Sequence, residues 1–473
     1  MFNDDDEIFD DEWDALEDLL QKYEKLKKGV TSSLLDEEDF ERIIEHYLQN
    51  SNEEQAMLAC DIGQTYYPFS SSLLLLKAEV LTQYQKFGQA LKLLDEIEQL
   101  DQQNIDAVLL RNDIFMAQNK YDKAAEWLEK NLQNFDGKEQ VELLLELTDV
   151  YDELENFDAV FNTLKRIIEM EKRNEEALQK ICFWADFTGR LDESVALHTQ
   201  ITEDDPYNTL AWFNLGAAYQ SLKLYEKAID AYEYCIAIDD KFEYAYRNLA
   251  DAYMRMRWYI NAIEVLEKHL EIAKPEDIIY EALGYCFEKQ KNFTKARQCY
   301  RQASQLNPQD DSIPYKIGET YSKEKQWDKA IKAYTVALNL NKESATYSIA
   351  IGNCLMEMNV FQEALLLYLN AVRLKPSQKS TWVALIRGLY FSKLYDEGLT
   401  QIPMAKESCG EKADFYYLHA ALLLELGKTK EAMLQLEEGL KISPTKARSF
   451  TQLNPDYLLR NDVADLLTRY KKK

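Results

Sequence analysis

The sequence contains little glycine and proline, and it lacks the motifs of common enzymes. Of its 473 residues, 14 are glycine and 9 are proline, which fits helices joined by short turns. No HExxH, glycine-rich phosphate loop or GxSxG segment occurs. The four histidines are expected to be packed structural residues: His46, His198, His269 and His419. We therefore predict a protein that is not an enzyme, with no catalytic residue and no cofactor.

The seven cysteines form no CxxC pair, and their odd number argues against a disulfide framework. Reduced, buried thiols are the simpler interpretation, and no clustered His and Cys ligands indicate a metal site. No apolar run is as long as a membrane-spanning helix requires, and the sequence does not begin with a signal peptide. We expect a soluble, cytoplasmic protein without a membrane span.

Acidic residues outnumber basic ones strongly. The chain has 83 Asp and Glu against 55 Lys and Arg, a formal net charge of −28. Such a chain repels phosphate backbones, so no nucleic-acid partner is expected. Long-range attraction favours partners that are basic.

A 34-residue period runs through most of the sequence. Counted from it, twelve units begin at residues 37, 71, 105, 141, 175, 209, 243, 277, 311, 345, 379 and 413, with one slip of two residues near 139–140. A fixed period in this range predicts a solenoid, in which each unit buries its apolar face against its neighbours. The residues that mark the period, at position 20 of each unit, are Ala56, Ala90, Ala124, Val160, Ser194, Ala228, Ala262, Ala296, Ala330, Ala364, Gly398 and Ala432.

Each unit has the pattern of two helices. Apolar residues at positions 4, 7, 8 and 11 form one helical stripe, and those at positions 20, 24 and 27 form a second. Small residues at positions 8 and 20 would let the two helices approach closely. Proline at position 32 of five units is expected to end the second helix.

This pattern resembles the tetratricopeptide repeat family. The sixth unit carries most of the family signature as Trp212, Leu215, Gly216, Tyr219, Ala228 and Tyr232. The resemblance implies an all-α, superhelical α-solenoid of about twelve stacked antiparallel helix pairs with helical caps. It also implies that positions 2, 5, 9 and 12 of the first helices line a concave surface where partners bind.

The sequence predicts four segments. Residues 1–12 form an acidic, disordered tail, and residues 13–36 form an N-terminal capping helix and linker. The repeats occupy residues 37–446. Residues 447–473 form a C-terminal capping helix, expected at 458–469, and a basic tail.

One candidate binding surface lies in units two to four. Leucine occupies position 5 of these units, and an acidic residue follows one helical turn later at position 9. An apolar strip bordered by carboxylates suits an amphipathic helix with a basic flank. Alternatively, the acids reflect the overall composition and the leucines pack on adjacent units. The residues are Leu75, Leu109, Leu145, Glu79, Asp113 and Asp149.

A second candidate lies in the middle of the array. Asn214 and Asn248 hold position 6 of consecutive units, where similar repeat proteins use asparagine to bind an extended peptide backbone. A solvated polar wall is the alternative. Arg247 and Asp251 also have the spacing of an i, i+4 ion pair. The accompanying residues are Phe213, Tyr244, Arg247, Asp251, Tyr285 and Tyr315.

We therefore predict a non-enzymatic scaffold that binds a protein segment or peptide, possibly a basic one, in the concave groove. The alternative is a structural repeat protein that associates with itself and frames a larger assembly. A third hypothesis is regulatory: the acidic tail competes with an acidic ligand for the groove, or it contacts Lys471, Lys472 and Lys473.

Overall fold

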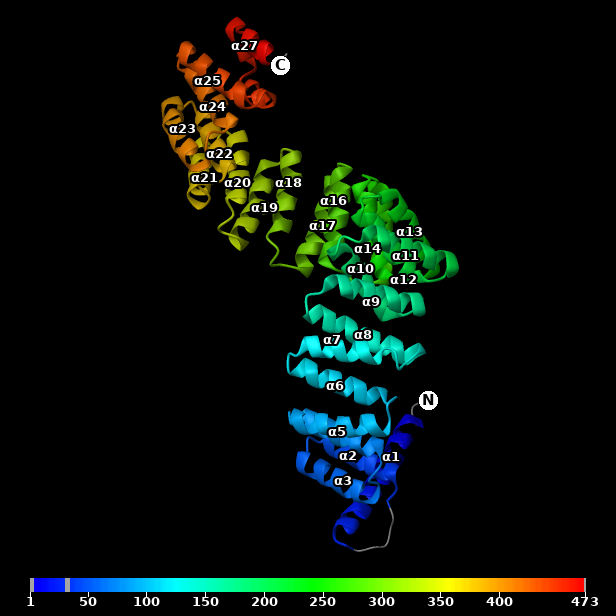
Figure 1. Cartoon of the computed structure of the whole chain (residues 1–473). Helices are drawn as coiled ribbons and strands as arrows, with labels where there is room; N and C mark the ends of the chain where they lie inside the picture. Colours follow the sequence, from blue (N-terminus) through cyan, green and yellow to red (C-terminus); the bar gives the residue numbers. More distant parts are fainter. Residues whose placement is uncertain (1–3, 30–34, 472–473) are drawn as a thin grey trace. The chain divides into compact units, whose positions relative to one another are not determined.

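The computed structural model describes the backbone of residues 4–29 and 35–471, which form helices and no strand (Figure 1). The chain divides into two compact units, residues 1–240 and 241–473. The first unit contains α1 (Asp4–Lys27), α2 (Glu37–Gln49), α3 (Glu53–Tyr66), α4 (Ser71–Gln83), α5 (Phe87–Leu100), α6 (Ile105–Ala117), α7 (Tyr121–Asn131), α8 (Gly137–Glu153), α9 (Phe157–Met170), α10 (Glu175–Phe187), α11 (Leu191–Asp204), α12 (Thr209–Ser221) and α13 (Tyr225–Ile238). The second contains α14 (Glu243–Arg255), α15 (Tyr259–Ile272), α16 (Asp277–Lys289), α17 (Phe293–Leu306), α18 (Ser312–Lys323), α19 (Trp327–Leu340), α20 (Ala345–Glu357), α21 (Phe361–Leu374), α22 (Lys379–Phe391), α23 (Tyr395–Cys409), α24 (Ala413–Glu425), α25 (Thr429–Ile442), α26 (Ala447–Thr451) and α27 (Asn461–Lys471), with short 3₁₀ helices at Pro444–Lys446 (η1) and Pro455–Leu459 (η2).

The helices keep the predicted 34-residue register. Ten of the twelve first helices begin at the first residue of their unit, and every second helix begins at position 17. The two exceptions are α18, which begins one residue late, and α8, which begins at Gly137 and accommodates the slip predicted near 139–140. In each unit of the structure, successive helices pack against one another, so both are all-α solenoids.

The turn between the two helices of a repeat has one backbone conformation throughout. Position 15 has a positive φ in all twelve repeats, and only Gly189 and Gly427 provide a glycine there. The other ten are residues such as Lys223 (φ 62°) and Asn359 (φ 60°). A side chain in this left-handed region is disfavoured by about 1 kcal/mol, so helix packing holds the turn against a local preference.

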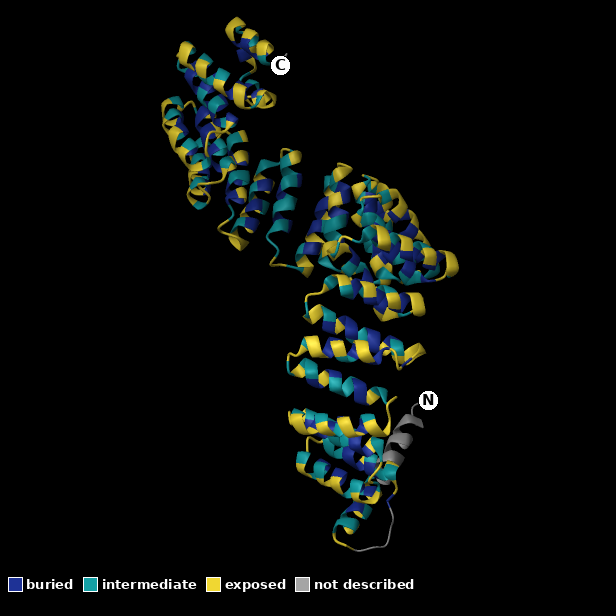
Figure 2. Cartoon of the chain, in the orientation of Figure 1, coloured by how far each residue is buried: buried dark blue, intermediate teal, exposed yellow. Residues whose placement is uncertain are grey.

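Glycine at position 8 allows a tyrosine at position 24 to lie against the first helix. A Cβ added at Gly284 would lie 2.5 Å from ring atoms of Tyr300, and one at Gly216 would lie 2.6 Å from the ring of Tyr232. Both tyrosines are buried. Figure 2 shows the buried residues of the helices in dark blue and the exposed ones in yellow. The small residues thus permit the close helix approach that the pattern predicts. The same pairing joins Gly318 to Tyr334 and Gly352 to Tyr368.

The first repeat is capped by α1. Leu19 and Tyr23 are buried, and the Tyr23 ring lies 6.4 Å from that of Phe40 on α2. The helix begins at Asp4 rather than at residue 13, so its backbone includes most of the stretch predicted to be a tail. Side chains before residue 16 lie outside the described residues, as do those of 471–473. The regulatory hypothesis for the tail therefore stays a prediction.

The C-terminal cap continues the repeat frame. Ala447, the first residue of α26, stands one full repeat after Ala413, the first residue of α24. Pro455 begins η2 at the point where the first helix of a further repeat would continue. The predicted helix at 458–469 is therefore wrong at its start: α27 begins at Asn461, and Leu458 and Leu459 are exposed on η2. Its apolar residues Val463, Leu466 and Leu467 are buried, as a cap requires.

Tyr457 fastens this cap to the last repeats. Its hydroxyl donates to Glu425 Oε1 at 2.6 Å and lies 2.8 Å from the hydroxyl of Tyr390. We expect Tyr457→Phe to lower the free energy of unfolding by about 1.5 kcal/mol, because a hydrogen bond to a charged acceptor is lost from a buried site. Urea unfolding monitored by circular dichroism measures the change. Tyr207→Phe, at a side chain that is 77% exposed, is the control and should have no effect. Equal stabilities of wild type and Tyr457→Phe would contradict the assignment.

Candidate functional site

The predicted leucine strip lies on α4, α6 and α8 of the first unit. Leu75, Leu109 and Leu145 are each half-buried. Leu75 packs at the edge of one apolar core, and Leu109 and Leu145 at the edge of the next. Both interpretations of these leucines are thus partly met, because each packs on a neighbour and also keeps some surface exposed.

Two of the three predicted carboxylates are unpaired, and one has a base. Burial raises the pKa of Glu79, and the nearby carboxylates of Asp106 and Glu45 raise it further. Burial also raises the pKa of Asp113. Asp149, by contrast, accepts a hydrogen bond from Lys180 Nζ at 3.0 Å. In the described part of the chain, Glu79 and Asp113 form no ion pair.

Glu146 on α8 joins this group and was missed from the sequence. Its Oε2 accepts a hydrogen bond from the buried Asn112 Nδ2 at 3.0 Å. Burial raises its pKa first, and the negative charges of Asp113 and Asp149 add to the shift. The structure therefore gathers carboxylates from α6 and α8. Glu146 stands at position 6, the same position as Asn214, which was the available signal.

An exposed aromatic cluster lies further along the same unit. Phe183 and Phe187 on α10 are 61% and 58% exposed. Their rings lie 6.0 Å apart, and each also contacts Trp184. Phe183 stands at position 9, the position that Glu79, Asp113 and Asp149 occupy in earlier repeats. A cluster of exposed aromatic rings of this kind often marks an interaction site.

Asn214 does not face a groove. It is buried, and its Nδ2 donates to the carbonyl oxygen of Leu178 at 2.6 Å and lies 3.3 Å from His198 Nε2. The amide group is therefore used to hold α12 against α10 and α11. Phe213 beside it is half-buried, with its ring 5.9 Å from that of Tyr232.

The remaining candidates belong to the second unit. Arg247 pairs with Glu276 at 3.5 Å, and Asp251 pairs with Arg255 at 3.4 Å. Asn248 is half-buried. Three tyrosines have ring contacts: Tyr244 with Phe242, Tyr285 with Tyr259, and Tyr315 with Tyr334 and Tyr347. Burial, followed by the charge of Glu319, raises the pKa of Tyr315 to about 12.

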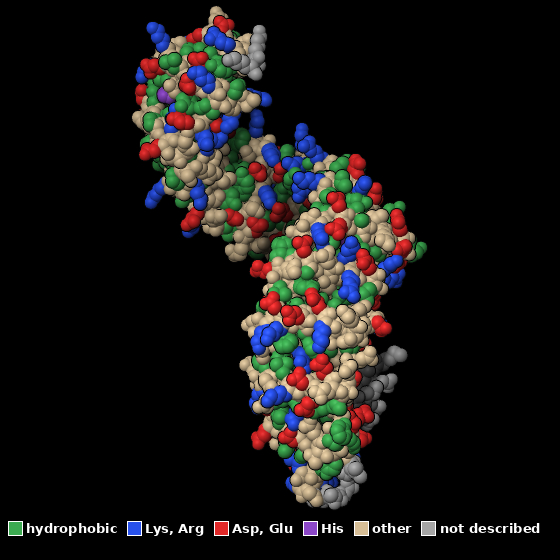
Figure 3. Space-filling view, viewed as in Figure 1, with side chains coloured by type: hydrophobic (Ala, Val, Ile, Leu, Met, Phe, Trp, Pro, Cys, Tyr) green, Lys and Arg blue, Asp and Glu red, His purple; other side chains and the backbone are tan. Residues whose placement is uncertain are grey.

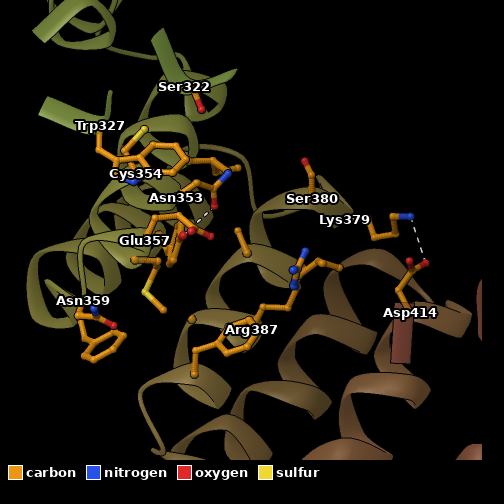
Figure 4. A pocket seen from close by; sticks show the side chains of 18 residues that line it. Ser322, Trp327, Asn353, Cys354, Glu357, Asn359, Lys379, Ser380, Arg387 and Asp414 are labelled. Atoms are coloured by element: carbon orange, nitrogen blue, oxygen red, sulfur yellow. Dashed lines mark hydrogen bonds and ion pairs between the residues drawn. The ribbon is translucent and has the colours of Figure 1, made fainter. Parts of the chain in front are cut away.

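A hollow of about 810 Å³ lies further along this unit, between α20 and α22 (Figure 4). Ile349 and Val383 line it from position 5 of their repeats, and Asn353 and Arg387 line it from position 9. These are two of the positions expected on the inner surface. The hollow was nevertheless missed as a site, although Arg387 is the one base at position 9 of the twelve repeats.

Tyr368 helps to shape this hollow. Its ring lies between two glycines: a Cβ at Gly352 would lie 2.6 Å from it, and one at Gly388 would lie 2.8 Å from it. Its hydroxyl donates to Asn353 Oδ1 at 2.8 Å. Burial raises the pKa of Tyr368, and the positive charge of Arg387 opposes that rise.

The charged rim contains one carboxylate that two lysines share. Asp414 on α24 accepts from Lys379 Nζ at 3.1 Å and from Lys446 Nζ at 3.0 Å. Burial acts to raise the pKa of Asp414, but these two hydrogen bonds lower it overall. Elsewhere, acidic and basic side chains alternate over the face seen in Figure 3.

The described residues meet the requirements of neither a metal site nor a membrane span. No group of three or more His, Cys, Asp and Glu side chains there could hold a metal ion. Within the same residues, no helix combines the length and the apolar character that crossing a bilayer requires. His198 and His269 are fully buried, and the seven cysteines are free.

Two family models match the sequence. Residues 217–351 match the C-terminal ARM domain of tetratricopeptide repeat protein 21, and residues 413–446 match a tetratricopeptide repeat. The chain carries tetratricopeptide repeats. The second match covers the last repeat from its first residue, Ala413, so its boundaries agree with those of the 34-residue frame.

Several solved structures are similar to parts of this tetratricopeptide array. YrrB, described as a TPR protein with an unusual peptide-binding site, is 18% identical with a TM-score of 0.34, over 39% of this chain and 95% of that one. The APC/C hetero-tetramer Cut9-Hcn1 is 14% identical with a TM-score of 0.36, over 86% of this chain and 95% of that one. The C-terminal part of a TPR repeat-containing protein from Cytophaga hutchinsonii is 14% identical with a TM-score of 0.44, over 54% of this chain and 99% of that one. No curated protein matches the sequence.

Proposed function

We propose that this tetratricopeptide array is a non-enzymatic protein-interaction scaffold whose first helices bind a protein segment. In the first unit the proposed segment is an amphipathic helix with basic residues along one side. The observation that carries the proposal is the group of unpaired carboxylates: among the described residues, Glu79, Asp113 and Glu146 form no ion pair, and each has a raised pKa. Burial raises the pKa of all three, and a lysine or arginine of a partner would stabilise their charged forms.

The apolar side chains nearby support the same partner. Leu75, Leu109 and Leu145 keep part of their surface exposed, and Phe183 and Phe187 provide exposed apolar surface further along the unit. A helix bound in a groove places apolar residues at i, i+3, i+4 and i+7 toward such a surface and its polar residues at the edge. The carboxylates would then contact the basic edge of the partner helix.

Reversing the charge of Glu79, Asp113 and Asp149 should strongly weaken this binding. We expect the triple variant Glu79→Lys, Asp113→Lys and Asp149→Lys to bind a fluorescein-labelled basic amphipathic helical peptide at least about 30-fold more weakly than wild type, because two unpaired acids and the Lys180-paired Asp149 all become positive. Fluorescence anisotropy titration at two salt concentrations measures the affinity. Binding to wild type should also weaken with salt and as the pH is lowered, since the raised pKa of Glu79 and of Asp113 makes these carboxylates protonate before an ordinary exposed acid does.

The matched control changes the same net charge elsewhere in the unit. Glu96→Lys, Glu126→Lys and Glu169→Lys replace three exposed acids on the second helices α5, α7 and α9. This control should bind within about twofold of wild type, because only distant charge has changed. Equal loss in both variants would show general electrostatic attraction and would refute a site on the first helices. Sedimentation velocity of the wild type tests the self-association alternative.

A further inference from the structure

The hollow between α20 and α22 has a base, Arg387, at position 9, where the candidate site of the first unit has acids. We propose that it binds an extended peptide segment through an acidic side chain that lies next to a large apolar one. This inference goes beyond the proposed function, because it assigns a second site in a separate compact unit and a partner segment of opposite charge.

The acid would bind to Arg387 and Asn353. In the described residues, Arg387 forms no ion pair although the chain has 83 acids, and its side chain is exposed. Asn353 Oδ1 accepts from Tyr368, so the amide Nδ2 remains to donate toward a ligand. Figure 4 shows the two side chains extending into the hollow from facing helices. A guanidinium and an amide that line the same hollow can bind a carboxylate with charge-assisted hydrogen bonds.

The apolar residue would lie along the wall that the same helices form. Ile349 and Val383 are half-buried, and Phe391 is 42% exposed at the end of α22. These side chains are neighbours of Asn353 and Arg387 on their own helices, one turn away. An acidic residue bound at Arg387 therefore places its sequence neighbour against this wall.

The site is held in shape before any ligand binds. Gly352 and Gly388 leave room for the Tyr368 ring on both of its sides, and the ring leaves no space for a Cβ at either position. The tyrosine hydroxyl in turn fixes the Asn353 amide. Such preorganisation lowers the entropic cost of binding. Glu357 also lines the hollow, and its carboxylate can accept a backbone N–H of a bound peptide. Its negative charge opposes a doubly charged phosphate more strongly than a single carboxylate, which favours a peptide ligand over a phosphate.

Selection from a display library of random dodecapeptides tests the proposal without a known partner. The full-length protein is used as bait beside the Arg387→Glu variant. We expect wild type to enrich peptides in which Asp or Glu lies within two residues of Leu, Ile, Phe or Met, and the variant to lose that enrichment. Recovery of no peptide, of basic peptides only, or of the same peptides with both baits would overturn the proposal.

A selected peptide then gives the affinity. By fluorescence anisotropy, Arg387→Glu should weaken its binding at least about 20-fold, and replacement of the peptide's acid by its amide should weaken it about 10-fold, since each loses the charged contact. Arg373→Glu is the matched control, at an exposed arginine on the second helix α21 that should leave the affinity within about twofold. Circular dichroism checks that all variants fold alike.

The two sites can fail independently. The triple charge reversal of Glu79, Asp113 and Asp149 lies in the first unit and should leave the selection of acidic peptides unchanged. Loss of acidic-peptide binding in that variant, with Arg387 intact, would overturn the assignment to α20 and α22. Loss of the basic helix alone would bear only on the proposed function.

Discussion

Replacement of Gly284 by alanine should destabilise the second unit by about 3 kcal/mol, near the upper end of the usual cost of overpacking. The added Cβ would lie 2.5 Å from two ring atoms of Tyr300, closer than atoms in contact can approach. That tyrosine is 1% exposed, and its hydroxyl donates to Glu288 Oε2 at 3.1 Å, so the ring cannot turn aside without losing a buried hydrogen bond. Urea unfolding and hydrogen exchange of the α16 and α17 amides measure the effect.

Gly88→Ala is the matched control for this substitution. Gly88 lies near the start of α5, and a Cβ there meets nothing within 4 Å. Because alanine has the higher helix propensity, this variant should be as stable as wild type or more stable by about 0.5 kcal/mol. The double variant Gly284→Ala with Tyr300→Leu should cost less than the two single changes added together. Full additivity would mean that the glycine and the ring do not contact each other.

Acidification from pH 7 to pH 4 should remove about 3 kcal/mol of stability through His198 alone. Burial lowers the pKa of this histidine to about 4, while the hydrogen bond to the Ser194 carbonyl opposes the shift. In the unfolded chain the imidazole takes up a proton near pH 6.5, whereas in the folded chain it stays neutral until about pH 4. Between these values the unfolded state binds more protons, so the free energy of unfolding falls as the pH falls.

His198→Gln isolates this contribution from that of the carboxylates. The variant lacks the imidazole, so its stability should fall less steeply below pH 6.5 than that of wild type. Urea unfolding at several pH values, followed by tryptophan fluorescence, to which Trp184 and Trp212 on the flanking helices contribute, gives both slopes. His46→Gln on α2 is the control substitution. Parallel curves for wild type and His198→Gln would show that the buried imidazole does not control the pH dependence.

The fold was predictable from the sequence because one local pattern repeats. Each repeat buries the same positions against its neighbours, so an apolar stripe read in one unit is tested again in the next. The start of α12 at Thr209 and that of α13 at Tyr225 follow directly from this register. The positive φ at position 15 was not predictable, because lysine, asparagine and glutamate occupy it as readily as glycine does.

The candidate site was only partly predictable, because position on a helix does not show what a side chain contacts. Asn214 and Asn353 both stand near the expected inner face. Asn214 is drawn into the core, where Leu178 accepts its hydrogen bond, whereas Asn353 stays exposed beside the hollow. The difference depends on partners from other helices, His198 for the first and Tyr368 for the second. Partner binding at the carboxylates of the first unit and partner binding at the hollow both stay predictions.

The incomplete repeat that begins at Ala447, formed by α26 and η2, determines where the array can be lengthened. Because α26 starts in phase with α24, a new helix pair of one repeat length inserted before Ala447 would present the cap with a surface like the one it already covers. Repeats could therefore be added there in whole modules, while Pro455 and the Tyr457 hydrogen bonds keep the segment that follows in its capping arrangement. An insertion of any other length would rotate the terminal segment away from its docking surface.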